Sequence, residues 1–166
     1  MKAHSIDTTM PEHAAEPSPG RRVICVRAQD SYYAMDLDYV ECVLPLMELQ
    51  PIPGGADYLA GMMNFRGKGL AVVDLGLWLG LDHPQRYNLD TPVIVCGSGS
   101  AQMAFVANEV LRIEPVNPDD MHRLGFFKQG AVPFEASLKL SFGVALLLDM
   151  QRILGVDFAD ADAGLR

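Results

Sequence analysis

Residues 51–79, PIPGGADYLAGMMNFRGKGLAVVDLGLWL, constrain the fold more than any other segment of the sequence. Two short apolar runs, residues 62–66 and 70–75, flank the glycine-containing stretch 67–69, which predicts two strands joined by a tight reversal. The one arginine of the segment, Arg66, stands where the first strand gives way to the turn. A lone guanidinium at the bend of an otherwise apolar strand pair is more typical of a docking surface than of a catalytic cleft.

Turn-forming residues set the boundaries within this segment. The prolines and glycines of Pro51–Gly55 predict a rigid turn. Asp57 is placed to cap a single helical turn that stops at Gly61, and Asp74 to cap a short helix over residues 76–81. Three glycines mark places where the backbone bends sharply or another surface comes close. They are Gly61, Gly67 and Gly69.

The rest of the chain is divided by turns into further short strands. Apolar runs predict strands at residues 23–28, 32–37, 39–46, 92–97, 101–107, 108–113, 137–140 and 144–149. Pro45 indicates an edge strand or a strand end, and the GSGS stretch at 97–100 predicts a hairpin turn. An irregular surface loop is expected over 115–133 and a short terminal helix over 149–154, with its apolar residues inward.

About nine or ten short strands with tight turns and only one-turn helices predict an all-β fold of small closed barrels, because closure removes exposed strand edges. That many strands fit two barrels of about five strands better than one large barrel. We expect a tail without regular structure over residues 1–20, one folded unit over 21–156 and a flexible acidic tail over 157–166.

Composition excludes several classes of protein. Apolar residues make up 49% of the chain and charged residues 20%, which is typical of a globular protein. The net charge of −8 argues against a binder of nucleic acid or of an anionic membrane surface, since both need a basic surface. No apolar run approaches the roughly 20 residues of a membrane helix, so no direct membrane insertion is expected.

The cysteines and histidines indicate no metal site or disulfide framework. Cys25, Cys42 and Cys96 are widely spaced in apolar runs, which predicts buried reduced thiols and a cytoplasmic location. The histidines have no second ligand at helical or strand spacing. They are His4, His13, His83 and His122.

No group of residues combines a nucleophile, a base and an orienting partner. Ser98 lies in a hairpin turn without the strand-turn-helix context of a nucleophile elbow. Glu109 and Glu114 are five residues apart on one strand and therefore face opposite sides. The sequence predicts a protein that is not an enzyme and binds no cofactor.

Two interpretations of Arg66 stay open from the sequence, a local structural role and a partner-binding role. On residue type alone, it pairs with a local acid such as Asp57 or caps carbonyl groups. Alternatively it binds a partner, because it lies among Met62, Met63 and Phe65, and interfaces are enriched in arginine, methionine and aromatic residues.

The segment 51–67 carries the pattern P-x-P-G-x-x-x-Y-x-x-G-x-x-N-x-R-G, followed by Val72-Val73-Asp74-Leu75. Weaker matches lie at residues 33–40, 105–110 and 147–154. In these motifs the sequence resembles the CheW-like family of chemotaxis coupling proteins over nearly all of residues 22–154. The resemblance implies two intertwined five-stranded, SH3-like barrels and a cytoplasmic adaptor without enzymatic activity, recruited to membrane receptor arrays.

The resemblance also implies partners. Such proteins bridge the cytoplasmic helical tips of chemoreceptors and the regulatory domain of a CheA-type histidine kinase. Receptor tips dock in the groove between the barrels, and the kinase contacts apolar strand surface at the barrel ends. The partner-binding candidates are Val40, Gly61 and Arg66, followed by Asn64, Val93 and Ile94.

The sequence departs from the family pattern at four positions. Cys42 stands where the family usually has Glu, Ala71 where it has Pro, and Ala104 and Asn108 where it has Gly and Asp. The change at 42 removes a polar contact and the change at 71 is expected to loosen strand geometry. Two alternatives therefore stay open, namely a coupler in a divergent chemosensory system with a non-motility output, and a small-molecule-binding β-barrel.

Overall fold

The computed structural model describes residues 20–82, 86–123 and 134–155, and the expected tails lie almost wholly outside these residues. No helix in this part of the chain is long and apolar enough to cross a membrane. Short strands dominate it, in the order β1 (Arg22–Ala28), β2 (Ser31–Asp36), η1 (Leu37–Tyr39), β3 (Val40–Pro45), β4 (Leu59–Phe65), β5 (Lys68–Asp74), α1 (Leu75–Trp78), β6 (Pro92–Ser98), β7 (Ala101–Val106), β8 (Glu109–Pro115), η2 (Pro118–Asp120), β9 (Met121–Arg123), β10 (Phe134–Leu140), β11 (Gly143–Leu148) and α2 (Met150–Leu154).

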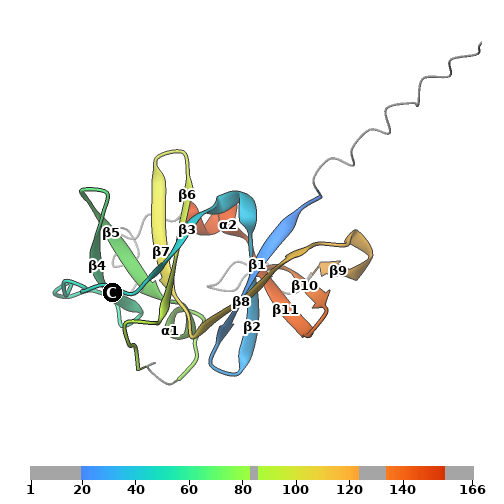
Figure 1. Ribbon diagram of the computed structural model, residues 1–166, viewed down its shortest axis with the longest axis horizontal. Helices are drawn as coiled ribbons and strands as arrows, with labels where there is room; N and C mark the ends of the chain where they lie inside the picture. The colour runs from blue at the N-terminus through green and yellow to red at the C-terminus, as the bar shows by residue number, and fades with distance from the viewer. Residues whose placement is uncertain (1–19, 83–85, 124–133, 156–166) are drawn as a thin grey trace, which may run out of the picture.

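The strands form two sheets that the chain enters in an interleaved order (Figure 1). The first barrel has the strand order β8-β1-β2-β11-β10-β9, and the second has the order β3-β6-β7-β5-β4. The chain therefore starts in the first barrel, builds all of the second and returns. Each sheet contains one parallel pair, β2 with β11 and β5 with β7, and the other pairs are antiparallel. The predicted all-β architecture of two intertwined barrels is confirmed, with six strands in one sheet because short β9 extends it.

Three clusters of buried apolar side chains form the core. One fills the first barrel, a second fills the second barrel, and the largest lies between the two. This inter-barrel core combines Met35 of β2, Ile94 of β6 and Phe105 of β7 with Ile153 of α2, all fully buried. Helix α2 follows the last strand of the first barrel but contacts β6 and β7 of the second. The predicted inward positions of this terminal helix are thus confirmed.

The structure corrects the prediction of a helical turn before β4. Residues 56–59 form a turn, in which the Leu59 amide donates to the Ala56 carbonyl at 2.9 Å, but no helical turn runs to Gly61. Leu59 already belongs to β4, and the Tyr58 carbonyl accepts the Asp74 amide at 2.7 Å. Pairing with β5 therefore outweighs the local capping signal of Asp57.

Other expectations hold with shifted boundaries. The reversal between β4 and β5 is the two-residue turn Arg66-Gly67, flanked by the pair Phe65 and Lys68, rather than residues 67–69. The hairpin turn after Ser98 is confirmed. The predicted loop over 115–133 contains η2 and β9, and its residues 124–133 lie outside the described part. Pro45 ends β3, which is an edge strand as predicted.

We expect the two barrels to unfold together, because the inter-barrel core joins them. Leu138, 1% exposed, packs inside the first barrel, whereas Trp78 packs against the inter-barrel core, with its ring centroid 5.9 Å from that of Phe105. Leu138→Ala should lower the free energy of unfolding by about 2–5 kcal/mol. The denaturant midpoint by Trp78 fluorescence should fall as far as the midpoint by far-UV circular dichroism. Val144→Ala, at a site 61% exposed, is the control and should change stability by less than about 0.5 kcal/mol. A Trp78 midpoint that stays in place would contradict joint unfolding.

Candidate partner-binding site

Arg66 occupies an unusual backbone position. Arg66 and Gly67 have φ angles of 52° and 80°, so both central residues of the turn are in the left-handed region. Two such residues make the type of turn that matches the twist of a two-residue hairpin. Glycine adopts this conformation freely, whereas an arginine there carries a cost of roughly 1–2 kcal/mol. The chain thus holds a long cationic side chain where glycine or asparagine is the favoured residue.

Neighbouring side chains fix this turn. The Asn64 Oδ1 atom accepts a hydrogen bond from the Gly67 amide at 2.9 Å, which stabilises the reversal. The Arg66 guanidinium lies 4.8 Å from the ring centroid of Phe65, which is 8% exposed and packs inside the second barrel. Arg66 itself is exposed and makes no ion pair with any described residue, Asp57 included. The structure therefore does not support the local ion pair and leaves the guanidinium turned to solvent.

The three glycines of this segment have the roles that the sequence predicted. Gly61 is buried, and a Cβ atom there would lie 2.8 Å from the Gln50 carbonyl oxygen. Gln50 and Met62 exchange two backbone hydrogen bonds of 2.8 Å, which join the segment after β3 to β4. Gly67 supplies the turn, and Gly69 lies under the Met62 side chain, whose sulfur would be 2.7 Å from a Cβ atom at 69. Glycine at these positions lets the chain and Met62 lie close to the hairpin.

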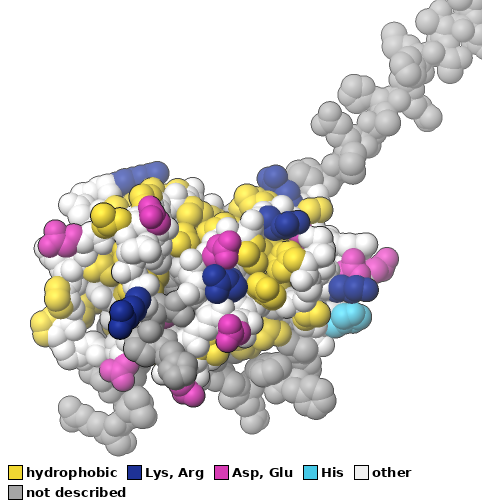
Figure 2. Space-filling view, turned by 60° about the horizontal axis from the view of Figure 1, so that its bottom comes forward, with side chains coloured by type: hydrophobic (Ala, Val, Ile, Leu, Met, Phe, Trp, Pro, Cys, Tyr) yellow, Lys and Arg dark blue, Asp and Glu magenta, His cyan; other side chains and the backbone are white. Residues whose placement is uncertain are grey.

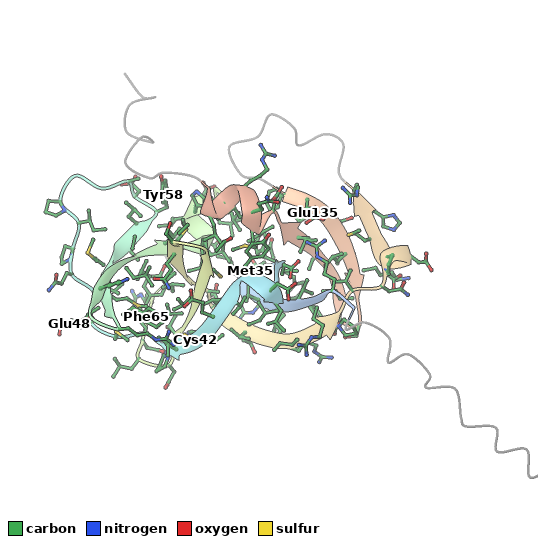
Figure 3. All side chains as sticks on the ribbon, turned by 90° about the horizontal axis from the view of Figure 1, so that it is seen from above. Met35, Cys42, Glu48, Tyr58, Phe65 and Glu135 are labelled. Carbon is green, nitrogen blue, oxygen red and sulfur yellow. The ribbon has the colours of Figure 1, made fainter. Side chains whose placement is uncertain are left out.

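A shallow groove of about 390 Å³ runs beside this turn. Met62, 39% exposed, forms the apolar part of the groove, and Lys68 and Glu48 supply opposite charges. Glu48 lies at the outer edge of the second barrel, and Phe65 lies within it (Figure 3). The groove is lined by Glu48, Gln50, Met62, Met63, Asn64, Gly67, Lys68 and Gly69. With Arg66 beside it, this hairpin groove offers apolar contact and two cations that form no ion pair with a described residue.

The other candidates divide into two groups. Val40 is half-buried at the start of β3, opposite Cys96 of β6, so it lies at the same end of the second barrel as the Arg66 turn. Val93 and Ile94 are fully buried, the first inside the second barrel and the second in the inter-barrel core. Their side chains cannot contact a partner while the barrels are folded, which corrects their place among the surface candidates. Gly61 also acts from within, by admitting the Gln50 segment.

Comparison with known proteins identifies the family of this chain. A model of the CheW-like domain matches residues 22–157. The chain belongs to the CheW-like domain family. The matched residues include both barrels, the Arg66 turn and the hairpin groove. The family resemblance of the sequence motifs is thereby confirmed.

Two relatives and one solved structure each match at least three quarters of this chain. The chain is 20% identical over 132 residues to the chemotaxis protein CheW of Thermotoga maritima, spanning 80% of this chain and 86% of that protein. It is 22% identical over 129 residues to the chemotaxis protein CheV3 of Helicobacter pylori, spanning 75% of this chain and 42% of that protein. The crystal structure of the scaffolding protein TtCheW from Thermoanaerobacter tengcongensis matches with a TM-score of 0.70 at 16% identity, covering 78% of this chain and 89% of that one. The last match shows the shared fold.

Strand β3 carries an acid beside position 42, where the family pattern usually has Glu and this chain has Cys. Cys42 is half-buried and packs against the interior of the second barrel. A β-bulge lies between Val40 and Cys42, and Glu41 is exposed there. The Glu41 Oε1 atom accepts a hydrogen bond of 2.8 Å from the Gln102 side chain. A carboxylate therefore remains on this strand, one residue before the family position.

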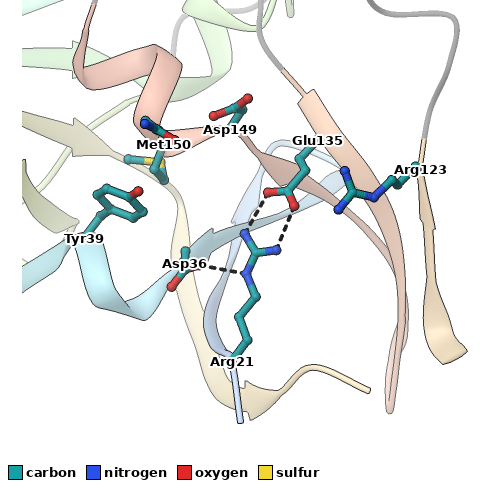
Figure 4. Close-up of a pocket in the computed structure, with 8 residues that line it drawn as sticks. Arg21, Asp36, Tyr39, Arg123, Glu135, Asp149 and Met150 are labelled. Carbon is teal, nitrogen blue, oxygen red and sulfur yellow. Dashed lines mark hydrogen bonds and ion pairs between the residues drawn. The ribbon is translucent and has the colours of Figure 1, made fainter. Parts of the chain in front are cut away.

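A second cavity, of about 330 Å³, lies where the start of β1, the end of β2 and β10 face α2 (Figure 4). Arg21 forms two hydrogen bonds of 2.7 Å to the Glu135 carboxylate and one of 2.7 Å to Asp36. The two bonds to Glu135, together with the charge of Arg21, lower the pKa of Glu135. Because 114 residues separate Arg21 from Glu135, no local pattern in the sequence signals this network. Its members bond to one another, and the network therefore links the start of β1 to β2 and β10.

The remaining chemical candidates have structural roles. The Asp74 Oδ1 atom accepts the Leu77 amide at 3.0 Å, which confirms its predicted role as an N-cap, and burial raises its pKa. Glu109 pairs with Arg27. Burial raises the pKa of the Cys25 thiol to about 11 and that of Cys96 to about 12, and both are free thiols. Within the described ranges, no three metal-binding side chains gather.

The Arg21–Glu135 pair predicts a pH-dependent stability. Glu135→Gln should lower the free energy of unfolding by about 2 kcal/mol at pH 7, because it removes charged hydrogen bonds of partly buried groups. The folded pKa of Glu135 lies below its ordinary value of 4.5, so the contribution is full above that value and is lost as pH falls through the folded pKa. Denaturant titrations at several pH values should show the two proteins converging in acid. A difference that stays constant down to pH 3 would contradict this. Glu109→Gln is the control, because Glu109 is 54% exposed and its pair should contribute less than about 1 kcal/mol.

Proposed function

We propose that this protein is a non-enzymatic adaptor that couples chemoreceptors to a CheA-type histidine kinase in chemotaxis signal transduction. Membership of the CheW-like family supports the proposal, as do relatives named as chemotaxis and scaffolding proteins. The observation that carries it is Arg66, a cation held in a left-handed turn beside the hairpin groove, which exposes Met62, and without an ion-pair partner among the described residues. Non-glycine residues in strained conformations concentrate at functional sites.

We assign the receptor contact to the hairpin groove and the Arg66 turn, which belong to the second barrel alone, in place of the groove between the barrels that the family resemblance implied. A receptor helical tip that presents an apolar face and a carboxylate fits Met62 together with Arg66 and Lys68. Exposed methionine suits such a surface because its flexible thioether adapts to different side chains. Asn64 acts here by stabilising the turn, and Val40 extends the surface at the same end of the barrel.

The packing of the barrel interiors supports the proposal of an adaptor over that of a small-molecule-binding protein. The interior of each described barrel is packed with its own side chains, such as Phe65 and Val72 in the second and Leu138 and Leu147 in the first. This packing disfavours the alternative of a small-molecule pocket inside a barrel. On the face drawn in Figure 2, basic and acidic side chains are interspersed with hydrophobic ones. Such a surface suits a protein partner better than a nucleic acid, and we place the protein in the cytoplasm, recruited to receptor arrays.

Arg66→Asn tests the receptor contact without removing a residue that the turn needs. Asparagine tolerates the left-handed conformation, so the variant should fold with unchanged or slightly greater stability. Its affinity for a receptor cytoplasmic helical-tip fragment from the same organism should fall about tenfold, as expected for loss of an arginine hot spot. Isothermal titration calorimetry measures the affinity, and thermal unfolding checks the fold.

Arg152→Asn is the matched control, since Arg152 is exposed on α2 and remote in sequence from the hairpin. It should bind the fragment like the unchanged protein. Equal affinities for the Arg66 and Arg152 variants would remove Arg66 from the receptor contact.

A further inference from the structure

Strand β8 leaves one of its edges without a partner strand. It stands first in the strand order of its sheet and pairs with β1 alone within the part of the chain that the structure describes. Just after β8, the Val116 amide donates to the Arg21 carbonyl at 2.8 Å. Because the backbone groups of a strand point alternately to its two sides, the N–H and C=O groups of Ile113 point away from β1. Such an edge is a template for pairing with another strand.

An exposed apolar side chain lies in the middle of this edge. Ile113 is opposite the buried Ile24 of β1, and yet 53% of Ile113 is exposed. Arg112 and Glu114 flank it and project to the other face, since successive side chains of a strand alternate. A nitrogen of Arg112 lies 3.6 Å from a carboxylate oxygen of Glu114, and Ser141 hydrogen-bonds to both side chains. The edge therefore presents an apolar residue with a cation before it and an anion after it.

The strand is self-complementary about Ile113. When two copies of β8 pair in antiparallel orientation with Ile113 at the centre, each Arg112 lies opposite the Glu114 of the other copy and the two Ile113 side chains meet. Moving the centre by one residue places Arg112 opposite Arg112 or Glu114 opposite Glu114, and like charges directly opposite each other destabilise a strand pair. The two-fold register centred on Ile113 is therefore favoured over both of its neighbours. A contact that uses the same surface of both copies closes as a dimer.

The local charge of β8 allows a second copy to approach. The chain has a net charge of −8, which opposes self-association in general. Along β8, however, each acid has a basic partner, because Glu114 pairs with Arg112 and Glu109 pairs with Arg27 at 3.2 Å. Pro115 has no N–H group to offer at the same edge, so it ends the stretch that a second strand can pair with. The contact is therefore short, and we expect a weak and reversible dimer.

We propose that β8 is a contact between two copies of this chain, which pair edge to edge in antiparallel orientation about a two-fold axis at Ile113. The inference goes beyond the proposed function, because it requires neither the receptor nor the kinase. Strand β8 belongs to the first barrel and the Arg66 turn to the second, so the contact uses no residue of the hairpin groove. A dimer of this kind carries two hairpin grooves, one on each copy.

Cross-linking of the full-length chain tests the register. In the proposed pair the two Cα atoms of residue 113 lie roughly 5.5 Å apart, within the range that a disulfide spans. Ile113→Cys should therefore form a disulfide-linked dimer under mild oxidation, seen on a non-reducing gel. Val144→Cys is the matched control, because Val144 is 61% exposed but lies on β11, and it should cross-link several-fold less. The unchanged chain gives the background from its own cysteines, and thermal unfolding under reducing conditions checks the fold.

Charge reversal tests the pairing of Arg112 with Glu114. Analytical ultracentrifugation of the full-length chain measures the dimer dissociation constant. Arg112→Glu should weaken the dimer about tenfold, because two matched cross-strand pairs become two like-charge pairs, and Glu114→Arg should do the same. The variant with both changes should recover the original dissociation constant to within about threefold, because it rebuilds the pairs with reversed signs. A role within one copy alone would change thermal unfolding and leave the dissociation constant in place.

Three results would overturn the inference. The first is a chain that sediments as a monomer at every concentration measured. The second is Ile113→Cys that cross-links no more than Val144→Cys. The third is self-association that persists unchanged in both single charge reversals, which would place the contact on another face. None of these results bears on the receptor contact, because the Arg66→Asn experiment measures that contact separately.

Discussion

The structure depends on the apolar contact between the two barrels. The inter-barrel core is the largest of the three buried clusters, and it takes side chains from the outer faces of both sheets. Small barrels fill their interiors with their own side chains and normally present a polar exterior. Here Met35 and Phe105 lie on outer faces and are nevertheless fully buried. Each barrel thus requires the other to cover part of its exterior.

The path of the chain reinforces this dependence. The first barrel gives strands from both ends of the described chain, and helix α2 crosses from it to pack on β6 and β7. At the other side, the Asn108 Oδ1 atom accepts the Gln29 amide at 2.6 Å, which ties the β1–β2 turn to the connection between β7 and β8. A unit held in this way keeps its surface sites at fixed positions. Fixed separation between surfaces is the property that an adaptor needs in order to hold two proteins together.

The sequence predicted the elements that local patterns encode. The strand pair around Arg66, the hairpin after Ser98 and the capping by Asp74 depend on neighbours a few residues away, and all three are present. The prediction of a helical turn capped by Asp57 was wrong, because pairing with β5 decides the conformation of β4 and the capping signal is weaker. Contacts between segments distant in the sequence decide how the two barrels are arranged.

The sequence analysis was least successful in predicting which side chains are exposed at the surface. Val93 and Ile94 face different clusters, and both are covered because the second barrel has apolar neighbours on each side of β6. Alternation of apolar residues cannot show that a sheet is buried on both faces. The same limit hid the Arg21 network, whose members come from segments distant in the sequence.

The departures from the family pattern differ in what they change. Ala71 lies in β5, which pairs with both β4 and β7, so the expected loosening of this strand is not seen. Asn108 accepts the Gln29 amide through an oxygen that aspartate also carries, so the link is kept without a charge. Both changes are therefore absorbed inside the fold. On β3, by contrast, the acid stands at Glu41 and is bonded to Gln102, which changes the surface beside Val40. Position 42 itself presents a half-buried thiol instead of a carboxylate, so of the three changes this one alters the surface rather than the interior of the fold.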